Sequence, residues 1–250
     1  MLEINKIHKM DVLDGLKSLD DNSIDLIITS PPYNKNGFSG HKKNTKKIWN
    51  STINYNDDEM NDFMDEEEYQ KWQIDILNEC FRVMKPEGSM FYNHKLRVKS
   101  NTASFPTDWI RKSNMILKDI IVWNRTAGPN VNKNGYVGVT EYIFWLIKQT
   151  KNIRFVRQQD IECKTNVWKI IPDKNTEHPA PFPLALPDNI IPNVSQGERI
   201  IVLDPFMGSG TVAISALKHG CDYIGFDKYQ KYIDMANERI EKCKSNNIYV

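Results

Sequence analysis

The chain has 250 residues, with 40% hydrophobic and 26% charged side chains and a formal net charge of +1. This length supports a sizeable core without disulfide staples, and no apolar run approaches the ~20 residues of a membrane span. The start, MLEINKIHKMD, lacks the apolar segment of a secretory signal, so we expect a soluble cytoplasmic protein with no membrane partner.

Taken in chain order, strand-like and helix-like stretches alternate. The predicted strands are IDLIIT (24–29), GSMFYNH (88–94), DIIVWN (119–124), YIFWLI (142–147), RIIVLD (199–204) and YIGFD (223–227), and the predicted helices cover 67–84, 211–220 and 229–244. Several strands are continuous apolar runs, which is typical of strands buried on both faces. The pattern predicts an α/β protein with a mostly parallel, doubly wound sheet.

Two stretches resist this assignment. The segment 35–65 is too long for an ordinary connection, and its first part mixes lysines with aromatic side chains. We interpret it as a mobile loop that contacts nucleic-acid phosphates through Lys42, Lys43, Lys46 and Lys47, although a merely solvated loop has the same composition. The segment 125–176 carries a second concentration of basic and amide side chains.

Cysteine usage indicates structural thiols. Cys80, Cys163, Cys221 and Cys243 are scattered along the chain, and no CxxC pair occurs. This spacing argues against a zinc site or a disulfide framework. We therefore expect reduced thiols and no metal site.

The first predicted strand ends in TSPPYN (29–34). Two consecutive prolines remove two backbone donors and fix two φ angles, so the chain leaves the sheet in a stiff direction. Such a tip leaves carbonyl oxygens free to accept hydrogen bonds and an aromatic face free to stack. The stretch is therefore a candidate for a site that grips a ligand.

A glycine-rich turn in RIIVLDPFMGSGTVAISALKHG (199–220) joins a strand to a helix. Gly208 and Gly210 allow close approach of a ligand, and the helix start near Thr211 offers unpaired N–H groups. Asp227 ends the next strand, at the place where doubly wound folds bind ribose hydroxyls. We expect a nucleotide-like ligand, although a turn without a ligand has the same pattern.

Two other nucleotide-binding motifs fit this turn less well. A P-loop has a lysine before its Ser or Thr, and GSGT has none. A dinucleotide dehydrogenase has glycine where Ala213 stands, but that position tolerates alanine. The dehydrogenase alternative therefore stays open, without a second signature of hydride chemistry to support it.

TSPPYN followed far downstream by DPFMGSGT resembles the amino-methylating DNA methyltransferases of the permuted beta class, in which the catalytic tetrapeptide precedes the cofactor turn. KMDVLDGLKSL (9–19) and HPAPFPLALP (178–187) are similar to further segments of that family. The resemblance implies a Rossmann-like methyltransferase fold with one antiparallel strand. It implies one domain over 1–250, with 125–176 as a small target-recognition insertion, S-adenosyl-L-methionine as cofactor and double-stranded DNA as substrate.

The same resemblance implies the cofactor site. The methionine part would lie against the glycine turn, the ribose against Asp227 and the adenine near Asp11. The implied cofactor-binding residues are Asp11, Asp204, Phe206, Gly208, Ser209, Gly210, Thr211, Asp227, His178 and Pro179. His178 and Pro179 fit a plain proline-stiffened connector equally well.

The tip suits methylation of an exocyclic amine, whose lone pair is delocalised into its base. Hydrogen bonds from the amine to the Ser30 side chain and the Pro31 carbonyl would draw the nitrogen toward tetrahedral geometry, while Tyr33 would stack on the base. The base must be flipped out of the duplex to make these contacts. The candidate catalytic residues are Ser30, Pro31, Pro32 and Tyr33.

The tetrapeptide also bears on which base is methylated. Within the family, serine in its first position is commoner among cytosine-N4 enzymes and aspartate among adenine-N6 enzymes. We prefer cytosine N4 and keep adenine N6 as the alternative, because serine can accept a hydrogen bond from either amine.

DNA contacts are expected from the recognition segment, with Arg125, Arg154 and Arg157 as candidates. The resemblance is compatible with a partner restriction endonuclease and with a homodimer. Two further alternatives remain. One is a catalytically inactive nucleic-acid-binding protein with the methyltransferase fold, and the other is a methyltransferase that acts on an amine or amide outside DNA.

Overall fold

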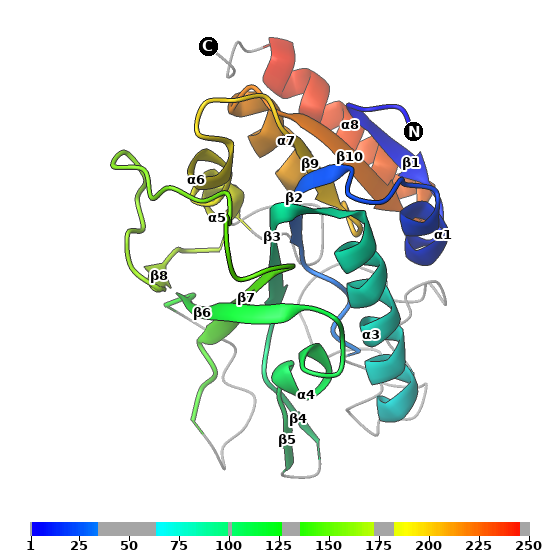
Figure 1. Ribbon diagram of the computed structural model, residues 1–250, viewed down its shortest axis with the longest axis vertical. Helices are drawn as coiled ribbons and strands as arrows, with labels where there is room; N and C mark the ends of the chain where they lie inside the picture. The colour runs from blue at the N-terminus through cyan, green and yellow to red at the C-terminus, as the bar shows by residue number, and fades with distance from the viewer. Residues whose placement is uncertain (1, 35–63, 100–101, 127–135, 173–182, 246–250) are drawn as a thin grey trace.

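The computed structural model describes residues 2–34, 64–99, 102–126, 136–172 and 183–245 (Figure 1). In chain order its elements are β1 (Lys6–Lys9), α1 (Val12–Lys17), β2 (Ile24–Thr29), α3 (Glu66–Val83), β3 (Met84–His94), β4 (Arg97–Lys99), β5 (Thr102–Ser104), α4 (Thr107–Ile110), β6 (Ile116–Asn124), β7 (Thr140–Ile147), β8 (Val167–Lys169), α5 (Ala185–Asp188), α6 (Ile191–Ser195), β9 (Ile201–Asp204), α7 (Thr211–Lys218), β10 (Asp222–Asp227) and α8 (Gln230–Ser245). All the predicted strands and helices are present.

Eight strands form one sheet in the order β1-β10-β9-β2-β3-β7-β6-β8, and β4 and β5 form a separate ribbon. The first five strands run parallel, β7 is antiparallel to both of its neighbours, and β8 is parallel to β6. Only β7 therefore runs against the others among the described strands of this sheet. The predicted mostly parallel sheet with one antiparallel strand is confirmed.

Helices cover both faces of the sheet, as Figure 1 shows for α3 and α8. One core lies under α5, α6, α7 and α8, and the other lies under α1, α3 and α4. Within β2, Leu26 and Ile28 join the first core while Ile27 joins the second. The continuous apolar run of this strand is thus explained by burial on both faces.

The structure modifies the picture of the two unassigned segments. Residues 35–63, with the four candidate lysines, lie outside the described residues. The segment 125–176 contains β7 and β8, which belong to the main sheet. Residues 140–147 and 167–169 of the predicted insertion therefore belong to the main sheet.

Two of the sequence expectations concern thiols and membranes. Cys80, Cys163, Cys221 and Cys243 are all free thiols. Among the described helices, none combines the length and the apolar character that crossing a bilayer requires.

Candidate active site

The tip, residues 30–33, follows β2 at the carboxyl edge of the parallel strands. β2 lies between β9 and β3, and all six of its residues are buried. Thr29, the last residue of β2, donates its hydroxyl hydrogen to Asp204 Oδ1 at 2.8 Å, and Asp204 ends β9. The structure thus brings the two predicted motifs together across 175 residues of sequence.

Buried side chains hold the tip from α3 and β3. The Tyr69 hydroxyl donates to the Pro32 carbonyl at 2.7 Å and lies 2.8 Å from His94 Nε2. Burial lowers the pKa of His94 to about 3, so its ring is neutral. Because the proton of Tyr69 is committed to Pro32, Nε2 of His94 carries the hydrogen that Tyr69 accepts. These bonds fix the direction in which the tip leaves the sheet.

A polar cluster surrounds the hydroxyl groups of Ser30 and Tyr33, which lie 2.8 Å apart. The Tyr33 hydroxyl donates to Glu141 Oε2 at 3.1 Å. Asn93 Nδ2 lies 2.7 Å from the Tyr33 oxygen, 3.1 Å from Glu141 Oε2 and 3.3 Å from Ser30 Oγ. Arg125 donates to Glu141 Oε1 at 2.8 Å. The cluster is assembled from β3, β7 and the end of β6, all at the tip's edge of the sheet.

The ring of Tyr33 is partly held by the protein. Its centroid lies 4.5 Å from that of His94 in a tilted arrangement, and Lys95 Nζ lies 5.7 Å from its centroid. Burial, followed by the nearby Glu141 carboxylate, raises the pKa of Tyr33 well above its ordinary value. The hydroxyl is therefore a neutral hydrogen-bonding group, and it positions the ring that was predicted to stack on a base.

Asn34 closes the base of the segment 35–63. Its side chain donates to the Met64 carbonyl at 2.8 Å and accepts from the Met64 N–H at 2.9 Å. Asn34 is 1% exposed and has a positive φ of 51°. The buried side-chain amide of Asn34 therefore joins the two residues that flank that segment, and it does so beside the tip.

The glycine turn joins β9 to α7. Gly208 and Gly210 have positive φ angles of 49° and 80°, and α7 begins at Thr211. The Gly208 N–H donates to Asp227 Oδ2 at 3.0 Å, and Arg239 donates to the Ser209 carbonyl. A Cβ at position 210 would lie 2.9 Å from Ala236 Cβ, so this glycine also permits the close packing of α7 on α8.

Two carboxyl groups, buried Asp204 and half-buried Asp227, end the neighbouring strands β9 and β10. Burial raises the pKa of Asp204 to about 7, against the hydrogen bonds from Phe206 N–H and Thr29, and Asp204 is 1% exposed. Burial also raises the pKa of Asp227, which accepts hydrogen bonds from the N–H groups of Gly208 and Tyr229. Cationic or hydroxyl groups of a ligand would stabilise both as carboxylates. The pair fits the ammonium and ribose groups of the implied cofactor.

The remaining cofactor candidates have varied surroundings. Asp11 follows β1, whose neighbour β10 ends in Asp227, but its carboxylate caps α1 by accepting from the Leu13 N–H at 3.0 Å. Phe206 packs edge-on against Trp72 with centroids 5.7 Å apart. Ser209 and Thr211 are buried in the turn. His178 and Pro179 lie outside the described residues.

The structure separates the three candidate arginines. Arg125 is paired with Glu141 beside the tip. Arg154 lies at the opposite, amino edge of the sheet, where it donates to the Val194 and Ser195 carbonyls and contacts Glu198. Arg157 is exposed and lines a cavity that excludes the tip. These three side chains therefore do not form one surface.

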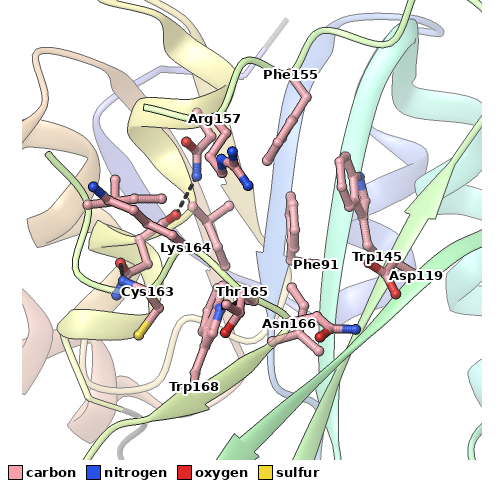
Figure 2. A pocket seen from close by; sticks show the side chains of 15 residues that line it. Phe91, Asp119, Trp145, Phe155, Arg157, Cys163, Lys164, Thr165, Asn166 and Trp168 are labelled. Atoms are coloured by element: carbon pink, nitrogen blue, oxygen red, sulfur yellow. Dashed lines mark hydrogen bonds between the residues drawn. The ribbon is translucent and has the colours of Figure 1, made fainter. Parts of the chain in front are cut away.

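That cavity measures about 160 Å³ and is shown in Figure 2. Phe91, Trp145 and Phe155 form an aromatic wall, with ring centroids 5.4 Å apart for the first two and 4.4 Å apart for the last two. Neither the tip nor the glycine turn contributes to its lining. It borders the first core and is separate from the candidate active site.

Sequence reasoning missed Tyr69, Asn93, His94 and Glu141. Asn93 and His94 end a buried strand, and that position was a usable signal because carboxyl ends of parallel strands meet at one edge. Glu141 is an acid at the start of an otherwise apolar strand, and the antiparallel direction of β7 brings it to the same edge. Tyr69 gave no such signal, because it occupies an ordinary core position on α3.

Comparison with known proteins adds a family match. The family described as DNA methylase, N6_N4_Mtase, matches residues 24–238. The Type II methyltransferase M.HinfI of Haemophilus influenzae is 30% identical over 264 residues, which cover 97% of this chain and 70% of that protein. The DNA adenine methyltransferase YhdJ of Escherichia coli (strain K12) is 28% identical over 262 residues, covering 92% and 81%.

Solved structures show the same fold. The cytosine-N4-specific PvuII DNA methyltransferase superposes with a TM-score of 0.73 at 20% identity, covering 97% of this chain and 92% of that one. M1.HpyAVI in its SAM complex superposes with a TM-score of 0.61 at 22% identity, covering 94% and 98%. At these identities the likeness concerns the fold alone.

Proposed function

This chain belongs to the N6/N4 DNA methylase family and is a DNA amino-methyltransferase that uses S-adenosyl-L-methionine, and from that premise we propose that it methylates N4 of cytosine in preference to N6 of adenine. The observation that supports methyl transfer at this site is the hydrogen bond between Thr29 and Asp204. It joins the tip to the glycine turn, so an amine at the tip and a methyl donor at the turn would meet at one edge of the sheet.

We assign catalysis to the tip. Ser30 Oγ and the Pro31 carbonyl would accept hydrogen bonds from the two N–H groups of a flipped base, and Tyr33 would contact its ring. Pro32 is held by Tyr69, so the clamp is stiff before the base arrives. Alignment of this kind can lower a barrier by ~7–11 kcal/mol without a strong base.

The turn and the strand ends would hold the cofactor. Asp204 would pair with its ammonium group, Asp227 would accept from its ribose hydroxyls, and the N–H groups of the turn would face its methionine part. The bound cofactor supplies a methyl group on a positively charged sulfonium. The raised pKa values of both carboxyl groups support this assignment, because a ligand cation or donor would relieve the cost of burying them.

Two observations bear on the methylated base. The serine at position 30 supports cytosine N4. The relative YhdJ is a DNA adenine methyltransferase by name, which keeps adenine N6 as the second candidate. We further propose a partner restriction endonuclease, which the Type II relative M.HinfI supports, and we keep the homodimer as a proposal that sedimentation would test.

For DNA contacts we keep the segment 35–65 with its four lysines, the described part of 125–176, and Arg157. Arg125 contributes through its pair with Glu141, and Arg154 is left out because it braces the amino edge of the sheet. The described ends of this segment, Asn34 and Met64, lie beside the tip, so lysines between them would meet phosphates near the flipped base.

Transfer of labelled methyl groups to mixed-sequence double-stranded DNA, followed by nucleoside digestion and mass analysis, tests the proposal. We expect N4-methylcytosine from the native protein and none from Ser30→Ala. N6-methyladenine would overturn the base assignment and keep the mechanism. Labelling of RNA or protein in preference to DNA would overturn the substrate class.

A further inference from the structure

We infer that Glu141 on β7 is a positioning residue that fixes the Ser30 hydroxyl as a hydrogen-bond acceptor, acting through the Tyr33 hydroxyl. The inference rests on the proposed role of Ser30 in binding the amine. It concerns the direction in which each hydrogen of the polar cluster points.

The direction follows from the carboxylate of Glu141. An ionised carboxylate only accepts hydrogen bonds, so the Tyr33 hydrogen points at Glu141 Oε2, 3.1 Å away. The Tyr33 oxygen then has only acceptor capacity left for Ser30, and the two oxygens are 2.8 Å apart. Ser30 must donate its own hydrogen to Tyr33. The lone pairs of Ser30 Oγ thereby stay available to N–H donors. Asn93 Nδ2 lies 3.3 Å from Oγ, but it lies closer to Tyr33 and Glu141, so acceptor capacity is left for a further donor.

Asn93 and Arg125 support this polarity. Arg125 Nη1 donates a charge-assisted hydrogen bond to Glu141 Oε1 at 2.8 Å. Asn93 supplies N–H groups to Tyr33 and Glu141, while its own Oδ1 is buried without a partner among the described residues. An unpaired buried amide oxygen is destabilising. With this orientation Asn93 donates to both Tyr33 and Glu141, and Arg125 donates to Glu141.

The consequence concerns the amine of the flipped base. Its N–H groups need acceptors, and a serine hydroxyl that pointed its hydrogen at the amine would oppose them. A glutamine at position 141 could donate to the Tyr33 oxygen, which would release the Tyr33 hydrogen toward Ser30 and turn the Ser30 hydrogen outward. Glu141→Gln keeps the shape of the side chain and removes the fixed polarity.

Single-turnover methyl transfer at saturating cofactor and DNA tests the inference in two backgrounds. We expect Glu141→Gln to lower the rate at least tenfold in the native chain. In a Tyr33→Phe background, which lacks the connecting hydroxyl, the same substitution should change the rate less than twofold. The dissociation constant for S-adenosyl-L-methionine should stay within twofold in both.

A tenfold fall in both backgrounds would overturn the route through Tyr33, and an unchanged rate in the native chain would overturn the role of Glu141. Either result leaves the proposed function intact, because that depends only on the native protein methylating DNA. Should Glu141→Gln not fold, Glu141→Asp and Glu141→Asn form a second matched pair, equally shortened and different only in polarity. The aspartate variant should be at least fivefold faster, and equal rates would overturn the inference.

Discussion

The carboxyl group of Asp204 couples the stability of the fold to pH. Thr29 Oγ1 and Phe206 N–H both donate to its Oδ1, and the group is 1% exposed. Its pKa is raised from 3.8 to about 7, so the folded state binds more protons than the unfolded state between these values. The free energy of unfolding contributed by this group therefore falls as pH rises through that window and stays low above it.

Asp204→Asn removes this ionisation and can keep both hydrogen bonds to Oδ1. We expect the variant and the native protein to be equally stable near pH 4, where both groups are neutral. Above pH 7 the variant should be more stable, by on the order of 2–4 kcal/mol. Urea unfolding of the protein without cofactor, from pH 4 to pH 8.5, measures the difference. A difference that does not vary with pH would contradict the assigned shift.

We expect Tyr69 to support activity as well as stability, because its hydroxyl holds the Pro32 carbonyl of the tip. Tyr69→Phe would leave the Pro32 carbonyl and the His94 N–H without their partner, at a cost of about 1–3 kcal/mol in unfolding free energy. Tyr92→Phe is the matched control, because its buried hydroxyl bonds to Gln73 and Trp109 and does not touch the tip.

Both variants should lose stability, which thermal melting would measure. Only Tyr69→Phe should also lower the methyl-transfer rate at saturating cofactor and DNA, because a misplaced clamp costs alignment. Equal rates for the two variants would show that the hydrogen bond to Pro32 stabilises the fold without positioning the tip.

At the scale of the elements, the contact of α7 with α8 depends on Gly210. Gly210→Ala would bring its Cβ 2.9 Å from Ala236 Cβ at a φ of 80°, adding steric overlap to backbone strain. Gly220→Ala is the control, since its φ is 67° and its Cβ would meet nothing within 4 Å. We expect about 1–2 kcal/mol from strain in each and a further ~1–3 kcal/mol for Gly210→Ala. Urea unfolding of both variants would show this ordering.

The elements were predictable where one physical signal was strong. β2 is buried on both faces, and its sequence IDLIIT is accordingly almost wholly apolar. β1, with the sequence KIHK, buries only Ile7. β8 has three residues and buries only Trp168. Short strands of this kind form because the neighbouring strand offers backbone hydrogen-bonding groups. That neighbour is distant in sequence, so the local residues do not predict the pairing.

For the molecule as a whole, the site was predictable as two motifs and not as one cluster. Ser30 and Asp204 could be found from the tip and the glycine turn, because prolines and glycines have strong local consequences. The two motifs lie side by side, joined by Thr29, because β2 and β9 are neighbours in the sheet. Glu141 joins them because β7 runs antiparallel to the other strands. Arg154 is the opposite case. It was predicted to contact DNA, but its guanidinium binds backbone carbonyls at the amino edge of the sheet.

The net charge of +1 offers DNA no general attraction, so binding must come from where the cations lie. We propose that the loop lysines neutralise phosphates. The slope of log K against log salt would then become shallower by up to about 1.8 in Lys42→Gln/Lys43→Gln, at ~0.9 for each lost contact. Lys46→Gln/Lys47→Gln should behave similarly, and cofactor affinity should not change in either variant.

Lys242→Gln/Lys244→Gln is the matched control for this charge change. These lysines pair with Glu238 and Glu241 in the last turn of α8, and α8 runs back from the carboxyl end of β10, away from the tip. Their loss removes the same charge and should leave the salt slope unchanged. If the control variant changed the salt slope as much as the loop variants do, DNA binding would depend on overall charge. The proposed role of the loop lysines would then be wrong.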